Sequence, residues 1–508
     1  MADDDRTPVV VGVGQVLQRD AERAQARGPL ELMAEAARRA ADDAGGGRRL
    51  LSAVDWLAAV SCLSWRMKNA PRGLAESLGA HPTAEVSTAT GGNMPQSLVN
   101  VAAREIQAGR VRVALIAGAE AIRSLRRARR AGSKPTWSSG GEGTPTLLGD
   151  ERQGHSDHEA AHGLMLPAQI YPLFENALRA KRGLSLEAHR AEVGRLCARF
   201  TRVAAKNPYA WFPVERTPDE ITLPTAENRM IAFPYTKRMN AILEVDQGAA
   251  VLLTSAAGAR ALGVPEERWV HWWGGGDAHE EPWFPTERGD LADSPALRAA
   301  GAQALAEAAV TIDAVRYLDL YSCFPCAVQI ARDMLGIAPE DPRELTLTGG
   351  LAYAGGPGNA YVLHSIARLV ERLRADRAAL GLVTAVGWFL TKHAAGVYAA
   401  HPRPTPDARA REAALSAAAV ELSAARAAAP VFTREPQGRG RIVSYTVVHD
   451  REGKPERGVV VGGLEDGRRF LALTPPDVAL LEGLERSEGI GRPGRVVRDG
   501  PVNRFTPD

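Results

Sequence analysis

Short runs of β-branched residues bounded by glycine alternate along the chain with longer amphipathic segments rich in Ala, Leu and Arg. This alternation is typical of α/β proteins, which are built from layers of helices and sheets. The pattern predicts strands at residues 8–12, 57–61, 84–88, 111–118, 249–254, 315–320 and 381–387. It predicts helices at residues 30–43, 94–108, 185–205, 295–309, 325–335 and 359–375.

One order of motif and elements occurs twice. The triplet Thr-Gly-Gly at 90–92 precedes a predicted helix and then the strand at 111–118, and the same triplet at 348–350 begins a glycine-rich turn before a helix and the strand at 381–387. A chance recurrence is the alternative, because the triplet is short and glycine is common. We expect two copies of one α/β unit, packed so that both glycine turns lie at a shared centre.

Composition also predicts how the chain divides into domains. A largely helical segment with Pro and Gly interruptions separates the two copies, and an alternating, strand-like region with turns at Glu452-Gly453 and Asp466-Gly467 ends the chain. That last region is expected to be a separable β module of the OB-like size class. We predict a first half at 1–260 with an insertion at 132–234, a second half at 261–401, a linker at 402–430 and a β domain at 431–508.

The overall composition excludes several classes of protein. The chain has 508 residues, 45% hydrophobic and 24% charged, which is enough to bury several cores with no cofactor or metal. Its net charge of +2 provides no general field for nucleic acid or an anionic membrane. The apolar run at 111–119 is far shorter than the ~20 residues that span a bilayer. Four cysteines and an acidic N-terminus, unlike a signal peptide, favour a cytoplasmic location.

Two motifs are weighed and set aside. His158, Glu159 and His162 match the HExxH pattern of zinc hydrolases, but Gly163 and Pro167 interrupt the helix and no third ligand is suitably spaced. We therefore expect no metal. A Gly-x-Gly pair at 12–14 follows the first strand, but the third glycine of a dinucleotide-binding loop is missing.

Two kinds of ligand-binding segment are compatible with the sequence. A basic cluster after the strand at 111–118 is either a solvated helix face or a site for one phosphate group: Arg123, Arg126, Arg127, Arg129 and Arg130. The backbone amides of the second glycine turn, at Gly350, Gly356 and Gly358, are either structural or suited to binding an oxyanion or a thioester oxygen.

Polar residues also follow two of the core strands. Tyr321, Ser322 and Cys323 come directly after the strand at 315–320, and Lys392-His393 follows the last core strand. Sites in α/β proteins lie at the carboxyl ends of strands, so these segments together indicate a functional site.

These segments resemble the thiolase superfamily, and within it the sterol-carrier-type thiolases and the mycobacterial thiolase-like proteins of type 1, which carry an additional C-terminal domain. The resemblance covers essentially the whole chain, through PVVVGVGQ, the GGN turn, AGAEA, NPYAWF, DQGAAVLLTS, YSCFPCAV, GGLAYAGGPGNAY and GWFLTKHAAGVY. It implies a five-layered fold from two similar halves, with an inserted helical loop domain and a C-terminal OB-like β-barrel. It also implies an acyl-CoA thioester or related lipid as ligand, a role in lipid or sterol metabolism, and either a thiolase-like homodimer or a monomer.

The chain departs from thiolases at every usual catalytic position. The first-half turn, where thiolases carry the nucleophilic cysteine, is Gly91-Gly92-Asn93, and the histidine of their Gly-His-Pro turn is replaced in Gly355-Gly356-Pro357. The Asn-Glu-Ala-Phe motif, His-Asp-Cys-Phe in the sterol-carrier branch, is replaced by 321–324, and the last Cys-x-Gly motif lacks its cysteine near 385–387. Ordinary thiolysis and Claisen condensation, which need a covalent acyl carrier, are therefore not expected.

Three functions stay open. A retro-aldolase acting on a β-hydroxyacyl thioester needs only a base and donors for the enolate oxygen. A non-catalytic acyl-CoA or lipid-binding scaffold needs neither, and Cys323 as a relocated nucleophile would restore acyl transfer. Candidates for the base are Tyr321, Tyr353, Tyr361 and His393, with Asn93, Cys323 and the amides of 349–358 as neighbours.

Overall fold

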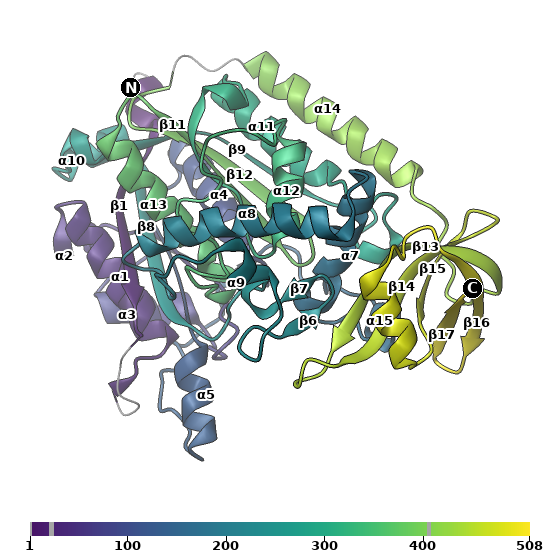
Figure 1. Ribbon diagram of the computed structural model, residues 1–508. Helices are drawn as coiled ribbons and strands as arrows, with labels where there is room; N and C mark the ends of the chain where they lie inside the picture. Colours follow the sequence, from purple (N-terminus) through teal and green to yellow (C-terminus); the bar gives the residue numbers. More distant parts are fainter. Residues whose placement is uncertain (1–2, 20–24, 404–407) are drawn as a thin grey trace.

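The computed structural model describes residues 3–19, 25–403 and 408–508. Its core is a sheet of ten strands in the order β10-β11-β12-β9-β1-β8-β4-β2-β3-β5 (Figure 1). The strands are β1 Pro8–Leu17, β2 Trp56–Ala59, β3 Ala84–Thr88, β4 Val113–Ala121, β5 Thr146–Leu148, β8 Asp246–Ser255, β9 Val270–His279, β10 Val315–Asp319, β11 Leu380–Gly387 and β12 Lys392–Ala399.

The topology of this sheet confirms the duplication. Four strands of the first half follow the order β2-β4-β8-β1, and four of the second half follow β10-β11-β12-β9. In both series the first pairing is parallel and the next two are antiparallel. The two halves join where β1 pairs with β9 at Val9–His271 and Val10–Val270.

Helices pack on the sheet in three groups, as the five-layered fold implied by the resemblance requires (Figure 1). Helices α4 (Met94–Gln107) and α13 (Tyr361–Ala375) contact strands of both halves and form the central layer. Helices α1 (Pro29–Asp43) and α3 (Ala70–Leu78) cover the outer face of the first half, and α11 (Pro295–Ala308) covers that of the second. The shorter helices include α2 Gly47–Ser52, α5 Ile122–Arg130, α10 Ala256–Ala261 and α12 Pro325–Met334.

Glycines in the central strands let the outer helices approach the sheet closely. A Cβ atom at Gly14 of β1 would overlap the carbonyl oxygen of Ala36 in α1, and one at Gly276 of β9 would overlap that of Ala300 in α11. The Gly-x-Gly pair at 12–14 is thus a packing feature that has a counterpart in the second half.

The segment between β4 and β8 is mostly helical. It contains α6 (Asp157–Ala161), α7 (Pro167–Lys181), α8 (Leu186–Ala205) and α9 (Pro218–Thr222), followed by the short strands β6 (Met230–Ala232) and β7 (Tyr235–Thr236). No helix in the described part of the chain is both long and apolar enough to cross a membrane.

The C-terminal region is a closed five-stranded β-barrel, as the resemblance implies. Strand β13 pairs with both β14 and β16, and the remaining pairings complete the ring. Strand β13 also pairs with β6 of the insertion, at Val448–Ala232. The elements are β13 Gly438–His449, β14 Pro455–Leu464, β15 Arg469–Leu473, α15 Val478–Arg486, β16 Pro493–Asp499 and β17 Val502–Pro507.

The segment predicted as a linker contains a packed helix. Helix α14 (Ala408–Ala427) lies against α11, and Arg298 of α11 forms an ion pair with Glu421. Residues 404–407 of that segment lie outside the described residues. The predicted domain boundaries themselves stay predictions.

The residues of the HEAAH motif are engaged in hydrogen bonds within the protein. His162 accepts a hydrogen bond at Nε2 from the backbone amide of Asn503 in β17 (3.0 Å), while its Nδ1 donates to the carbonyl oxygen of His158 (2.8 Å). Glu159 accepts from the amide and hydroxyl of Thr286 (3.1 and 2.9 Å). Within residues 3–19, 25–403 and 408–508, no three potential ligands are grouped to hold a metal ion. The motif instead connects the insertion, the second half and the barrel.

Buried polar contacts attach the barrel to α7. Arg179 is 2% exposed and donates to both carboxylate oxygens of Glu488 (2.6 and 2.7 Å). The Asn176 side chain donates to the carbonyl oxygen of Tyr445 (2.9 Å), and the Ser444 hydroxyl donates to that of Leu173 (2.6 Å). The surface beneath the barrel therefore includes groups that need the barrel as their partner.

This docking predicts the effect of Arg179→Met, which keeps most of the side-chain volume but removes the charge-assisted bonds to Glu488. We expect the free energy of unfolding to fall by about 2 kcal/mol, since hydrogen bonds to charged groups contribute roughly that much. The measurement is urea denaturation followed by circular dichroism. The control is Arg190→Met, an exposed arginine of α8. Equal stability of the two variants would contradict an energetically coupled barrel.

Candidate functional site

The two glycine turns meet between the halves of the molecule. The backbone amide of Gly91, just before α4, donates to Oδ1 of Asn359, just before α13 (2.9 Å). The Asn359 side chain also donates to the carbonyl and hydroxyl oxygens of Ser61, each at 2.9 Å. One asparagine of the second half thus connects the first-half turn to the end of β2, as expected of a shared centre.

Tyr321 reaches this centre from the end of β10. A Cβ atom at Gly92 would overlap the Tyr321 hydroxyl oxygen and would lie 2.6 Å from the carbonyl oxygen of Val386. The Tyr321 backbone amide donates to the Thr384 hydroxyl (2.9 Å), which fixes where the side chain leaves the strand. The hydroxyl of Tyr321 therefore occupies the space into which any side chain at Gly92 would project.

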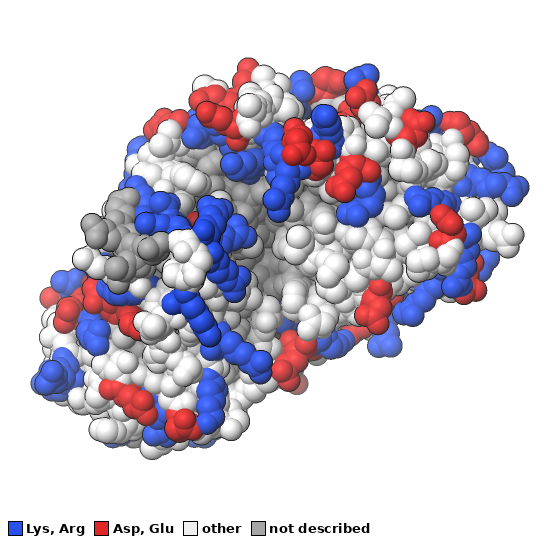
Figure 2. Space-filling view, turned by 90° about the horizontal axis from the view of Figure 1, so that it is seen from below, with Lys and Arg blue, Asp and Glu red and all other residues white. Residues whose placement is uncertain are grey.

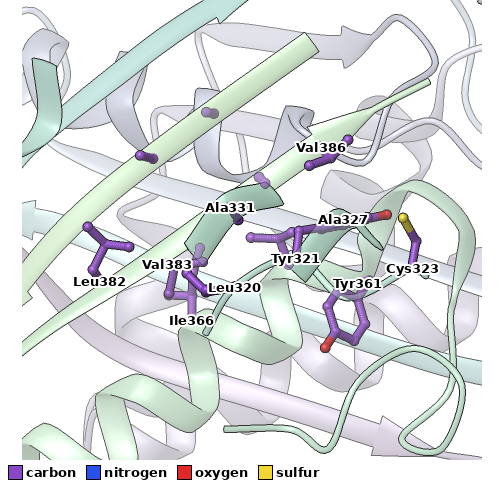
Figure 3. Close-up of a cluster of buried hydrophobic side chains, with 14 of the residues drawn as sticks. Leu320, Tyr321, Cys323, Ala327, Ala331, Tyr361, Ile366, Leu382, Val383 and Val386 are labelled. Atoms are coloured by element: carbon purple, nitrogen blue, oxygen red, sulfur yellow. The ribbon is translucent and has the colours of Figure 1, made fainter. Parts of the chain in front are cut away.

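Tyr361 lies next to Tyr321, but its hydroxyl serves another contact. The two rings are perpendicular, with centroids 5.6 Å apart and an interplanar angle of 88°. Figure 3 shows their hydroxyl groups pointing in different directions. The Tyr361 hydroxyl shares a hydrogen bond with the hydroxyl of Thr348. Burial raises the pKa of both tyrosines well above the ordinary value, so both hydroxyls keep their protons at neutral pH.

Cys323 is close in sequence and in space, but it is not activated. The side chain is buried among apolar neighbours (Figure 3), and burial raises the pKa of its thiol to about 12, although a hydrogen bond with Tyr171 acts in the opposite direction. A thiol with such a pKa contains almost no thiolate at neutral pH, and the thiolate is the nucleophile.

The second glycine turn is occupied by contacts within the protein. The amide of Gly350 donates to the Thr348 hydroxyl (3.1 Å), that of Gly356 to the carbonyl of Ile242 (2.9 Å), and that of Gly358 to the carbonyl of Gly356 (2.7 Å). These three amides, expected from the sequence to be ligand donors, have partners in the folded chain.

Tyr353 leaves the same turn in a different direction. Its ring is buried beside the Cys197 thiol of α8, and burial raises the pKa of its hydroxyl. The structure does not bring Tyr353 together with Tyr321 at Gly92.

His393 faces away from the centre. It follows Lys392 on β12, and successive side chains of a strand point to opposite faces. Its Nε2 atom lies 3.2 Å from the Ser294 hydroxyl and 3.7 Å from Glu280, on the side covered by α11. Burial lowers its pKa to about 3, so the ring is neutral at physiological pH. The structure thus places His393 on the opposite side of β12 from Tyr321, although the sequence indicates both as candidate bases.

Lys392 occupies the central position instead. Its Nζ atom donates to the backbone carbonyls of Thr90 (2.6 Å) and Asp150 (3.0 Å), and the end of its side chain lies within 3.1 Å of where Cβ atoms would stand at Gly91 and Gly387. The side chain is buried, and burial lowers its pKa to about 8 despite the charge of Asp150. Strand alternation would have indicated that either Lys392 or His393 faces the centre, but not which one.

Asn93 lies beside the end of the Lys392 side chain. The residue is 7% exposed and its Oδ1 atom has no hydrogen-bond partner among the described residues. That oxygen is directed at the positions where Cβ atoms would stand at Gly91 and Gly387. The Nδ2 atom makes two long contacts, with the sulfur of Met94 (3.7 Å) and with the Ser97 hydroxyl (3.4 Å). A buried carbonyl oxygen without a donor indicates a place where a ligand group would be accommodated.

The basic cluster lies on α5, which directly follows β4. Arg123 stacks on Trp211 with its guanidinium 5.2 Å from the ring centroid, and Arg126 forms an ion pair with Glu244 at 2.7 Å. The Trp211 amide donates to the carbonyl of Ala354 in the second glycine turn (2.9 Å). Figure 2 shows Lys and Arg side chains gathered around a hollow on the face toward which α5 projects.

Comparisons with known proteins agree with this architecture. Residues 420–501 match the family described as thiolase-like protein type 1 additional C-terminal domain. The structure of a monomeric SCP2-thiolase like protein type 1 from Mycobacterium smegmatis is 35% identical, covers 99% of this chain and 100% of its own, and superposes with a TM-score of 0.83. No curated protein matches the chain.

Two more distant structures share the fold alone. The Ltp2-ChsH2(DUF35) aldolase is 20% identical, with a TM-score of 0.59 over 78% of this chain and 98% of that one. The acetyl-CoA acetyltransferase from Syntrophomonas wolfei is 15% identical, with a TM-score of 0.56 over 78% and 99%. Because the mycobacterial match extends over both thiolase halves and the barrel, this chain belongs to the SCP2-thiolase-like proteins of type 1.

Proposed function

We propose that the chain binds an acyl thioester of the CoA type and makes or breaks a carbon–carbon bond in the acyl group without forming an acyl-enzyme. The observation that carries this proposal is the Tyr321 hydroxyl, which fills the space in front of Gly92. A nucleophilic side chain has no room there, while a hydrogen-bond donor is present. Chemistry that needs donors but no covalent acyl carrier is therefore favoured.

Retro-aldol cleavage of a β-hydroxyacyl thioester meets that requirement. A water molecule or hydroxide ion takes the proton of the β-hydroxyl, the Cα–Cβ bond breaks, and a ketone or aldehyde leaves. The electron pair of that bond moves to the thioester oxygen as an enolate, which then takes one proton from solution at Cα to give the shortened thioester. Burial raises the pKa of Tyr321, so this hydroxyl remains protonated and acts as a donor to the enolate rather than as a base. His393 is directed away from this position, which removes it from the candidate bases.

Two further observations support the thioester ligand. Arg123 of α5 stacks on Trp211, whose amide is bound to the second glycine turn, and Lys and Arg side chains gather around a hollow on the face toward which α5 projects (Figure 2). Phosphate groups would bind at this surface while the acyl end lies deeper. The distant fold neighbours include an aldolase and an acetyl-CoA acetyltransferase. We also propose that the chain is a monomer, as the mycobacterial relative is described.

Incubation with acetyl-CoA tests the absence of an acyl-enzyme. We expect calorimetry to detect saturable binding and intact-protein mass spectrometry to detect no acetyl adduct, because the Cys323 thiol is protonated and Gly92 carries no side chain. An acetyl group located on Cys323 would overturn the mechanism. Binding without turnover of any β-hydroxyacyl thioester would favour a non-catalytic carrier, and failure of every thioester to bind would remove the thioester proposal.

For a β-hydroxyacyl-CoA that is cleaved, Tyr321→Phe should lower kcat by about 100-fold, the usual cost of losing one donor to a developing oxyanion. The control is Tyr317→Phe, which removes a hydroxyl bound to Asp376 elsewhere on the second half. We expect that control to retain the parental rate. Equal rates for the two variants would contradict the assignment of Tyr321.

Gly92→Ala tests the steric part of the argument. The new methyl group would meet both the Tyr321 hydroxyl and the backbone carbonyl of Val386, so we expect a loss of about 1–3 kcal/mol in the free energy of unfolding. Gly483→Ala, in α15, is the control, because a Cβ there meets nothing within 4 Å. That variant should be as stable as the parent, or more so. Equal stability of the two variants in urea denaturation would contradict the crowding at Gly92.

A further inference from the structure

The buried amine of Lys392 has a hydrogen-bonding pattern suited to its neutral form. A neutral amine has two N–H groups and one lone pair, whereas an ammonium has three N–H groups. Two backbone carbonyls, of Thr90 and Asp150, accept from Nζ at 2.6 and 3.0 Å. These two bonds satisfy both donors of the neutral amine and leave its lone pair free.

The charges around Lys392 do little to hold a proton on it. The carboxylate of Asp150 is bound by Arg152 at 2.7 Å, so the two charges that act on the amine form an ion pair with no net charge. Asp150 favours the ammonium and Arg152 disfavours it, while burial is the largest influence and lowers the pKa to about 8. About half of the Lys392 side chains are then neutral at pH 8, compared with less than about 1% for an ordinary lysine.

A second, independent feature indicates a ligand at this point. The Oδ1 atom of Asn93 is buried, unpartnered among the described residues, and lies in front of Gly91 and Gly387 beside the end of the Lys392 side chain. A hydroxyl or N–H group of a ligand bound next to Nζ would donate a hydrogen bond to Asn93 Oδ1. No donor among the described residues does so.

We propose that Lys392 is a reactive amine that forms an iminium with the carbonyl carbon of a ketone or aldehyde bound between the two halves. The Nζ lone pair attacks the carbonyl carbon, and the carbonyl π electrons move to oxygen, which takes a proton from nitrogen to give a carbinolamine. The carbinolamine oxygen then takes one proton from solution and leaves as water. Amine, carbonyl compound and one proton are thus converted to iminium and water.

This inference does not depend on the thioester proposal. A ketone or aldehyde is the second product of a retro-aldol cleavage, so one site could serve both reactions, but the amine can be tested with a ketone that carries no CoA. The competing explanation is a structural lysine that only ties β12 to the loops at Thr90 and Asp150. A structural lysine would stabilise the fold without being selectively reactive.

The test is reductive trapping on the full chain. The protein is incubated at pH 8 with sodium cyanoborohydride and either butan-2-one or acetoacetyl-CoA, and the adducts are located by peptide mass spectrometry. Six exposed lysines serve as internal controls: Lys68, Lys134, Lys181, Lys206, Lys237 and Lys454. We expect at least about 10-fold more adduct on Lys392 than on any of these, because far more of its amine is neutral.

Lys392→Arg is the matched variant, since it keeps a cation and N–H donors for the two carbonyls but is not a nucleophile. It should fold and give no adduct at position 392. Acetic anhydride provides a second readout that needs neither ketone binding nor folding of a variant: labelling of Lys392 should rise with pH through about 8.

The outcomes separate the two proposals. Trapping with butan-2-one but not with acetoacetyl-CoA would support the reactive amine and count against the thioester ligand. Trapping with both supports both. Absence of any adduct on Lys392 while the six exposed lysines react, or an equal distribution over all seven, would overturn the inference and leave the structural lysine.

Discussion

The fold depends on the close approach of helices to the backbone of its central strands. Outer helices lie against glycines of β1 and β9, and α4 approaches β9 and β12 at Gly275 and Gly396, where Cβ atoms would overlap the side chains of Asn100 and Gln96. Interiors this tightly packed cannot adjust to one added methyl group without shifting a backbone. A side chain at any of these strand positions would therefore displace a neighbouring helix or one of its buried side chains.

That constraint also positions the site. Helices α4 and α13 share the central layer, so the turns that precede them must meet, and the hydrogen bond from Gly91 to Asn359 is the point of contact. Strand alternation then decides which side chains of β12 reach the turns. Lys392 faces the central layer and His393 faces α11, although the two are neighbours in sequence.

Much of the architecture could be predicted from the sequence, because the doubled turn-helix-strand order and the C-terminal alternation are strong signals. Strands β9 and β12 were not predicted. Both contain glycines where helices need space, in VHWWGGGDAH and KHAAGVYA, so neither shows the β-branched run used to identify strands. The features that make these strands central are the same features that conceal them in the sequence.

The site was less predictable, for a different physical reason. Residue type alone does not choose among the candidate bases Tyr321, Tyr353, Tyr361 and His393. The directions of their side chains do, because only the Tyr321 hydroxyl lies against Gly92. Lys392 lies in a segment that the sequence indicated as part of the site, but it was not among the candidate bases, since its burial and its two carbonyl acceptors become visible only once β12 is placed. The HEAAH motif is the opposite case, because its residues match a catalytic pattern in the sequence but make contacts within the protein. His162 contacts the barrel and Glu159 contacts the second half.

The relation between Tyr321 and Gly92 explains why a nucleophilic side chain cannot be placed at Gly92 by one substitution. A cysteine at Gly92 would meet the hydroxyl of Tyr321, which follows β10, and the carbonyl of Val386 in β11. The ends of two strands of the second half therefore lie directly against the glycine turn of the first half. Shortening Tyr321 would remove only the first obstacle, because a backbone carbonyl moves only if the strand moves. The exclusion of a side chain at Gly92 is therefore built into the packing of the two halves, and the chemistry of the site has to be sought in the groups that fill this space.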